Sequence, residues 1–197
     1  MSDRCGWVGD DALYQRYHDE EWGVPVTDAR ALWEALMLEG FQAGLSWITI
    51  LRKREAFRAA FAGFDPHIIA KWGQSEVERL LQNPGIVRHR GKIEGAIASA
   101  RAFQEIEAAQ GFTNYIWSFV DNRPLQPKPA RLEDVPAQTE LSKAMSKDLK
   151  GRGFKFCGPT ITYAFMQAVG LVNDHLVTCP RHDPVASFAM NLHKGFG

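Results

Sequence analysis

Four side chains that commonly bind metal ions stand near the two ends of this chain: Cys5, His18, His175 and Cys179. Two thiolates and two imidazoles are a usual ligand set of a closed tetrahedral zinc site. A site built from all four would hold together two chain ends that otherwise tend to fray. The alternative is a buried Cys5 and three unrelated side chains, because spacing alone does not pair distant residues. The pattern therefore favours a fold in which the terminal regions meet.

The size and composition of the chain bound its class. A chain of 197 residues with 45% hydrophobic content can bury one substantial core. Three cysteines do not form a disulfide framework, which favours a reducing compartment. The first residues do not resemble a signal peptide, and no apolar run approaches the ~18 residues that cross a bilayer. We therefore expect a monomeric, cytoplasmic protein without membrane contact. It would form one domain over residues 1–197, with two helical lobes as the open alternative.

Hydrophobic residues recur at helical spacing along nearly the whole chain. One helix is predicted from Thr27 or Asp28 to Gly40, and another from Ser46 to a stop at Gly63. Asp65 followed by proline predicts a helix start, and Ser75 with Glu78 predicts a capping box. Further helices are expected at about 90–109, 113–120, 140–151 and 159–169. The proline-rich segment 121–136 is the one long irregular connection. The sequence therefore predicts an all-α fold.

A helical hairpin is predicted where the helix over 140–151 is followed by a glycine-bounded turn and a second helix. A plain pair of packed helices accounts for this pattern. A helix-hairpin-helix accounts for it equally, because its glycines let a DNA phosphate approach the backbone and the second helix's amides bind the anion. In that case the DNA-binding residues would be Gly153, Lys155, Gly158 and Thr160.

Basic and acidic residues balance at 23 each, which argues against a protein that coats nucleic acid non-specifically. The basic residues nevertheless cluster in three places, at 52–54, 88–92 and 147–155. Each cluster is either part of a local basic face or an ordinary solvated helix face.

Glu39 and its aromatic neighbours form the second unusual feature. Glu39 would lie at the negative end of its helix dipole, where a carboxylate is disfavoured by ~0.3–1 kcal/mol. A carboxylate beside indole rings would suit a flat cationic ring, and Trp47 begins a helix where its side chain can face a cleft. The alternative is an exposed glutamate that tolerates its position. Trp33, Trp72 and Trp117 are interpreted as core residues.

Several long segments together resemble the bacterial 3-methyladenine DNA glycosylase I family. They are RCGWV, YHDEEWG, LEGFQAGLSWITIL, GIVRHRGKI and RGFKFCGPTITYAFMQAVGLVNDH, in fixed order from residue 3 to about 179. The resemblance implies an all-α helix-hairpin-helix DNA glycosylase fold with one structural zinc per chain. It implies zinc ligation by Cys5, His18, His175 and Cys179. It also implies a base pocket with Glu39 and Tyr17 as hydrogen-bonding groups, Trp47 as the stacking platform, and Trp7 and Trp22 nearby.

The activity implied by this resemblance is base excision from alkylated double-stranded DNA. The nucleotide would be flipped out of the duplex, its N-glycosidic bond hydrolysed, and free 3-methyladenine released to leave an abasic site. Two other classes compete with this interpretation: a zinc hydrolase, and a non-enzymatic zinc-stapled DNA-binding module. Four protein ligands would leave a catalytic zinc no position for water, which disfavours the first.

Two features depart from the family pattern. The segment after Cys179 is longer than expected, and His182 within it is a rival ligand. Asp174 stands where many relatives in the wider superfamily have a catalytic aspartate, but this family is regarded as lacking that residue. Asp174 is therefore interpreted as structural.

Overall fold

The computed structural model describes residues 4–191, and within this range it contains helices and no strand. The elements in chain order are α1 (Ala12–Glu20), α2 (Ala29–Gln42), α3 (Trp47–Ala60), η1 (Ala62–Phe64), α4 (Pro66–Ile69), α5 (Gln74–Leu81), α6 (Arg90–Gln110), α7 (Phe112–Ser118), η2 (Leu132–Asp134), α8 (Glu140–Gly151), α9 (Pro159–Ala168) and α10 (His182–Asn191). The predicted all-α fold is confirmed. In this described part of the chain, no helix has the length and apolarity needed to cross a membrane.

Short polar side chains begin several of these helices. Asp28 accepts a hydrogen bond from the Ala31 amide at 2.8 Å, and Asp65 accepts one from the His67 amide at 2.9 Å. Both caps satisfy amides that have no partner within the helix. The predicted starts of α2 and α4 therefore follow from local sequence.

Two predicted boundaries are wrong. α2 continues through Gly40 and ends at Gln42. A glycine is needed at position 40 for another reason: a Cβ atom there would be 3.2 Å from the Phe156 carbonyl oxygen. Glycine at this position serves a close approach between α2 and the turn after α8, and it does not end the helix.

The capping box predicted at Ser75 and Glu78 is also wrong. α5 begins after Gly73, whose amide donates to Glu76 Oε2 at 2.8 Å. Glu78 instead accepts from Arg90 Nη2 at 2.8 Å, so it joins α5 to the start of α6. Glu76 and Glu78 both lie near the start of this helix, so the sequence alone does not show which of them forms the capping contact.

Two α-helices had no sequence-based prediction. α1 is capped by Asp11, whose Oδ1 accepts from the Leu13 and Tyr14 amides at 3.0 Å each. α10 lies in the segment after Cys179, and residues 192–197 of that segment lie outside the described range.

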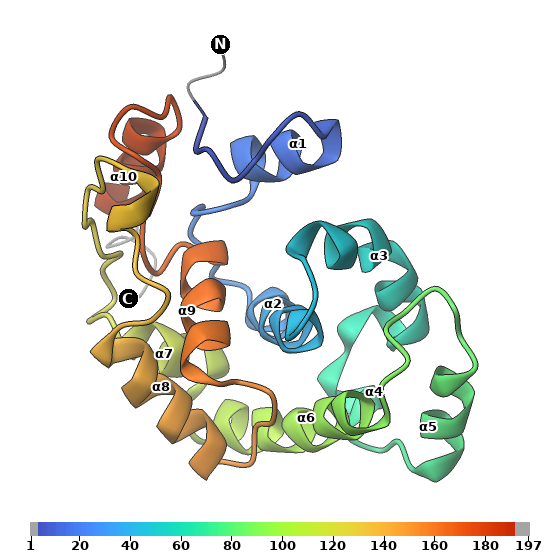
Figure 1. Cartoon of the computed structure of the whole chain (residues 1–197). Coiled ribbons are helices and arrows are strands. Elements are labelled where there is room, and N and C mark those ends of the chain that lie inside the picture. Colours follow the sequence, from blue (N-terminus) through green and yellow to red (C-terminus); the bar gives the residue numbers. More distant parts are fainter. Residues whose placement is uncertain (1–3, 192–197) are drawn as a thin grey trace.

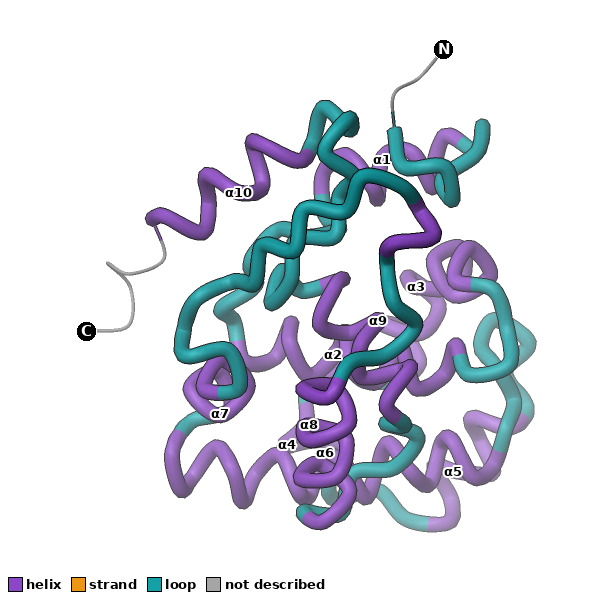
Figure 2. The backbone as a smooth tube through the Cα atoms, turned by 60° about the vertical axis from the view of Figure 1, so that its left-hand side comes forward, coloured by secondary structure: helices purple, strands orange, loops and turns teal. Residues whose placement is uncertain are grey.

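α2 occupies the centre of the molecule (Figure 1). It contacts α3, α6, α7 and α9, and the main hydrophobic core forms around it. Trp33 and Trp117 are fully buried in this core and Trp72 packs against it, as predicted. Figure 2 shows α10 extending from the end of the molecule that also carries α1.

A second, smaller hydrophobic cluster joins the terminal regions. Its buried members are Cys5, Val8, Tyr17, Trp22, Leu51 and Cys179. Trp47 packs against both this cluster and the main core. The first residue of α3 therefore lies where the two clusters meet.

Candidate active site and metal centre

Cys5, His18, His175 and Cys179 come together in one buried cluster, with their ligand atoms all within 4.8 Å of one another. The distance from Cys179 Sγ is 3.6 Å to His18 Nε2 and 3.6 Å to His175 Nδ1. A tetrahedral zinc ion with bonds of about 2.3 Å to sulfur and 2.0 Å to nitrogen would separate such atoms by roughly 3.5 Å. The donor set and its spacing therefore fit a four-coordinate metal ion.

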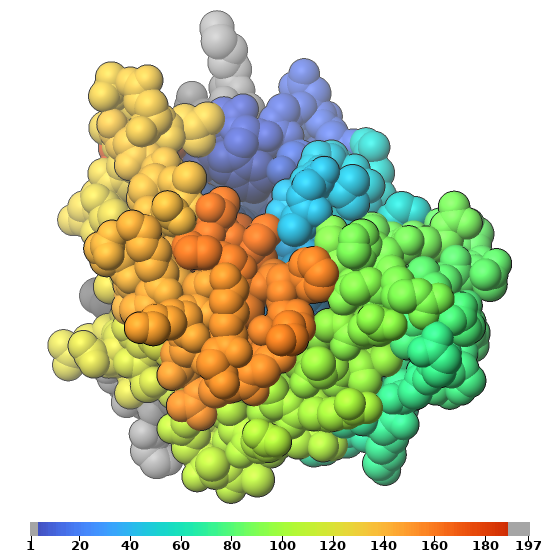
Figure 3. Space-filling model, turned by 60° about the horizontal axis from the view of Figure 1, so that its bottom comes forward, coloured from blue at the N-terminus to red at the C-terminus, as the bar shows by residue number. Residues whose placement is uncertain are grey.

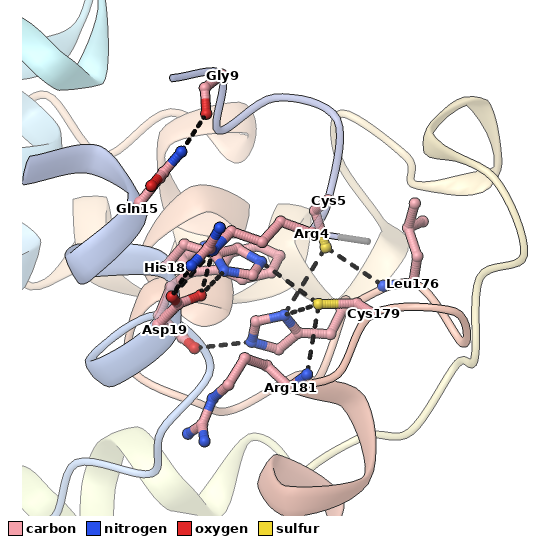
Figure 4. Close-up of polar contacts among 11 residues, drawn as sticks. Arg4, Cys5, Gly9, Gln15, His18, Asp19, Leu176, Cys179 and Arg181 are labelled. Carbon is pink, nitrogen blue, oxygen red and sulfur yellow. Dashed lines mark hydrogen bonds and ion pairs between the residues drawn. The ribbon is translucent and has the colours of Figure 1, made fainter. Parts of the chain in front are cut away.

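The other nitrogen of each imidazole is already engaged. His18 Nδ1 donates to Asp19 Oδ1 at 2.8 Å, and His175 Nε2 donates to the Trp22 carbonyl oxygen at 3.0 Å. These bonds fix the tautomers, so that His18 Nε2 and His175 Nδ1 face the cluster. Figure 4 shows His18 with Asp19 beside it and Arg4 beyond, whose Nη2 lies 2.7 Å from Asp19 Oδ2. Such outer hydrogen bonds are typical of metal-binding histidines.

The two sulfur atoms also accept backbone hydrogen bonds. The Leu176 amide donates to Cys5 Sγ and the Arg181 amide donates to Cys179 Sγ, each at 3.5 Å. The hydrogen bond from the Cys5 thiol is the largest cause that holds the pKa of Cys179 well below the ordinary thiol value, and the same pairing raises the pKa of Cys5. The cluster thus already stabilises a thiolate, which is the form that binds metal.

His182 does not join this cluster. Its side chain is buried, and Nδ1 lies 2.8 Å from Asp183 Oδ1 at the start of α10. The rival ligand considered from sequence is therefore not part of the four-residue group.

A pocket of about 310 Å³ opens beside the metal cluster. It is lined by Cys5, Trp7, Tyr14, Tyr17, Trp22, Glu39, Gln42, Trp47, Leu132, Val135, Pro136, Ala164, Gln167, Asp174 and Leu176. All five side chains expected from the sequence to form a base pocket are among them. The structure therefore brings all five to one cavity, although they come from the loop before α1, α1 itself, the turn after it, α2 and α3.

Glu39 lies in the last turn of α2 and is only 4% exposed, so the alternative of an exposed glutamate is wrong. Burial raises the pKa of Glu39 from 4.5 to about 8. No hydrogen bond from a protein group to its carboxyl group is seen within the described part of the chain. The free protein therefore holds Glu39 largely protonated near neutral pH, with its polar atoms available to a ligand.

Aromatic rings connect this pocket to the metal cluster. Trp7 contacts Trp22 at a centroid distance of 5.0 Å, and Trp22 contacts the His175 ring at 4.7 Å. Two other lining rings, those of Tyr17 and Trp47, lie 5.6 Å apart, centroid to centroid. Burial, and then the proximity of Glu39, raises the pKa of Tyr17 well above its ordinary value. Its hydroxyl is therefore a neutral hydrogen-bond donor at any physiological pH.

Asp174 also reaches the pocket wall. It is 2% exposed, and its Oδ2 accepts from the Tyr163 hydroxyl at 2.6 Å and from Gln167 Nε2 at 2.9 Å. Its Oδ1 has no protein hydrogen-bond partner among the described residues. These bonds support the structural interpretation, and they also place a second carboxyl group near the cavity.

Sequence reasoning missed several pocket residues. Tyr14 shares one face of α1 with Tyr17 and His18, and helical spacing would have identified it had α1 been predicted. Leu132 and Val135 come from the irregular segment before α8, and no sequence signal points to them.

The predicted hairpin is formed by α8, a seven-residue turn at 152–158 and α9, and it lies beside α6 on the surface (Figure 3). Gly153 has a φ of +101°, which disfavours any other residue. Gly158 precedes α9, no side chain caps this helix start, and a Cβ atom at Gly158 would meet nothing within 4 Å. Lys155 and Thr160 are both exposed. The turn thus presents an accessible helix start, whereas Arg152 is bound to Asp148 at 2.7 Å.

The other basic clusters are mostly engaged within the protein. Arg52 pairs with Asp11 and Arg54 pairs with Glu21. Lys92 is buried, so the cluster at 88–92 is not wholly a surface feature.

Comparisons with known proteins identify relatives of this chain in both sequence and fold. The methyladenine glycosylase family model matches residues 7–182. DNA-3-methyladenine glycosylase 1 of Escherichia coli (strain K12) is 54% identical over 178 residues, which cover 90% of this chain and 95% of the relative. A crystal structure of 3-methyladenine DNA glycosylase I has a TM-score of 0.89 and 56% identity, covering 91% of this chain and 99% of that one. A variant of 3-methyladenine DNA glycosylase I in complex with 3-methyladenine has a TM-score of 0.88 and 38% identity, covering 90% and 96%. Because the matched region includes the helices that form both the pocket and the hairpin, this chain belongs to the methyladenine glycosylase family.

Proposed function

We propose that this protein is a monofunctional DNA-3-methyladenine glycosylase that acts in base-excision repair. It hydrolyses the N-glycosidic bond of 3-methyladenine in alkylated double-stranded DNA, releasing the free base and leaving an abasic site. The observation that carries the proposal is the buried Glu39 carboxyl group in an aromatic pocket, in a chain that belongs to this family.

The charge of the lesion suits this pocket. Methylation at N3 makes the adenine ring cationic while it is attached to deoxyribose, and departure of the base then yields a neutral purine. Glu39 is kept protonated by burial, and a cation in the pocket favours its ionised form. An unmodified adenine offers no charge to offset that ionisation. Glu39 therefore favours the methylated base. The N-glycosidic bond of the methylated nucleotide is already weak, and this weakness contributes much of the rate of excision.

Tyr17 and Trp47 position the flipped base. Extrusion from the duplex costs a few kcal/mol. Stacking on Trp47 contributes ~1–3 kcal/mol, and the Tyr17 hydroxyl donates a hydrogen bond to the base. Trp7 and Trp22 close the side of the pocket that faces the metal cluster.

The metal cluster is proposed to hold one structural zinc ion per chain. A zinc ion bound there would tie Cys5 and His18 to His175 and Cys179, and so fix the N-terminal segment that carries Trp7. Four protein ligands complete a tetrahedral shell, which favours a structural role over that of a zinc hydrolase.

The hairpin is proposed to bind the DNA backbone in helix-hairpin-helix fashion. The amides at the start of α9 would bind a phosphate, with Gly158 and Gly153 allowing its approach and Lys155 and Thr160 adding polar contacts. A non-enzymatic DNA-binding module would account for this hairpin but not for the pocket around Glu39. We expect the protein to act as a monomer in the cytoplasm.

The decisive test is release of free base from methylated duplex DNA, separated by chromatography. The expected result is release of 3-methyladenine that increases with enzyme concentration, and little release from an unmethylated duplex of the same sequence. Binding of the methylated duplex without base release would contradict the glycosylase proposal and favour the non-enzymatic module.

A further inference from the structure

Lys92 lies in the first turn of α6 and is buried, with only 8% of the residue's surface exposed. Its Nζ donates to the Phe41 carbonyl oxygen at 2.9 Å and to the Ala43 carbonyl oxygen at 2.6 Å. Within the described part of the chain, no carboxylate forms an ion pair with it. Burial lowers the pKa of Lys92. Burial of an ammonium group without a carboxylate is costly, so this group depends on the two carbonyls that bind it.

The two carbonyls lie at the C-terminal end of α2. The last carbonyls of a helix lack partners within it, and this end of the dipole is negative. α2 has no basic residue of its own in the last turn. Lys92 therefore supplies, from another helix, both the missing donors and the missing positive charge.

The segment that Lys92 binds joins the two principal groups of the proposed pocket. Glu39 precedes Phe41 by two residues, and Trp47 follows Ala43 by four. Gln42, which lies between the two carbonyls, also lines the pocket, and its side-chain amide donates to the Leu45 carbonyl. Lys92 itself does not line this pocket. It is thus placed to set the path of the backbone between Glu39 and Trp47 without touching a bound base.

We infer that Lys92 is a positioning residue, which holds the 41–47 segment so that Glu39 and Trp47 face the same base. For its catalytic readout this inference rests on the proposed function. A misplacement of about 1 Å at a reacting site can lower a rate by 10²-fold, so loss of this anchor should affect the chemistry more than the fold.

The test uses Lys92→Met, which keeps the length of the side chain and removes the ammonium group. In hydrogen–deuterium exchange, the amides of residues 43–48 should exchange faster than in the parent, while those of α6 and α9 stay protected. Single-turnover excision of 3-methyladenine should fall on the order of 10- to 100-fold. Lys92→Arg, which restores a charged donor, should recover part of both losses.

Asp28→Ala is the matched control, because it removes the cap at the opposite end of the same helix. It should lower the stability of α2 and leave exchange at residues 43–48 and excision near the parent's values. If Lys92→Met behaved like Asp28→Ala in both measurements, Lys92 would be only a helix cap and the inference would be wrong.

Two further outcomes are separable. If Lys92→Met does not fold, Lys92→Gln, which keeps a shorter donor, takes its place under the same criteria. If the parent releases no base at all, the proposed function fails, and local exchange at residues 43–48 alone decides the role of Lys92.

Discussion

Replacement of Glu39 by glutamine should make the protein more stable, by an amount that depends on pH. Burial raises the pKa of Glu39 from 4.5 to about 8. Between these two values the folded state binds more protons at this residue than the unfolded state does, so stability falls as pH rises. The slope is about 1.4 kcal/mol per pH unit. Glutamine has nearly the same size and does not ionise, so the Glu39→Gln variant lacks this loss.

The magnitude follows from the same two values. At pH 7 the folded Glu39 is mostly protonated and the unfolded one mostly ionised, which disfavours the folded parent by about 3 kcal/mol. The advantage of Glu39→Gln should therefore be about 3 kcal/mol at neutral pH and approach 5 kcal/mol above pH 8. It should vanish below pH 4.5, where both states of the parent are protonated.

Urea unfolding of parent and variant near pH 5, pH 7 and pH 9 measures this difference directly. Comparison at each pH cancels the titration of groups that both proteins share. Glu105→Gln, an exposed position on α6, is the control and should show no comparable trend. A stability difference that did not change with pH, or a Glu39→Gln variant less stable than the parent at pH 7, would refute the reasoning. The same variant should excise 3-methyladenine more slowly, since it cannot provide a carboxylate.

Three further predictions concern the other parts of the site. Trp47→Ala should weaken binding of 3-methyladenine by ~1–3 kcal/mol and leave affinity for abasic DNA nearly unchanged, as measured by fluorescence titration with each ligand; parental excision by a folded variant would place the stacking surface elsewhere. Gly158→Val should fold normally, since nothing lies within 4 Å of the added Cβ, but it should weaken abasic-DNA binding and reduce its salt dependence. Unchanged affinity for abasic DNA would exclude the turn as the phosphate site. Metal analysis should find one zinc per chain, and His175→Ala should lose it along with several kcal/mol of stability while the surviving folded enzyme keeps its base preference. A metal-free parent of normal stability would contradict the structural zinc.

The helices that contain their own start signals could be read from the sequence. Asp28 and Asp65 cap α2 and α4 as predicted, because a cap uses side chain and backbone within three residues of each other. α1 had no prediction although Asp11 caps it in the same way. Gly40 was misread as a helix end. Its role is a contact with Phe156, more than a hundred residues later, and local sequence does not contain that information.

The site likewise has features that the sequence shows and features that only the structure shows. The residue types of the metal cluster and the pocket were evident from the sequence and from the family it resembles, because thiols, imidazoles, indoles and a misplaced carboxylate are chemically distinctive. Their distances were not, because Cys5 and Cys179 meet only when the chain folds. The raised pKa of Glu39 depends on its burial between segments. The sequence places Lys92 in a basic cluster, whereas the structure buries it against the end of α2. The sequence by itself thus determined which chemical groups are present and which helices they begin or end. Only the tertiary structure decided which of them are removed from water and paired with one another, because burial is a property of packing between segments that the chain order does not specify.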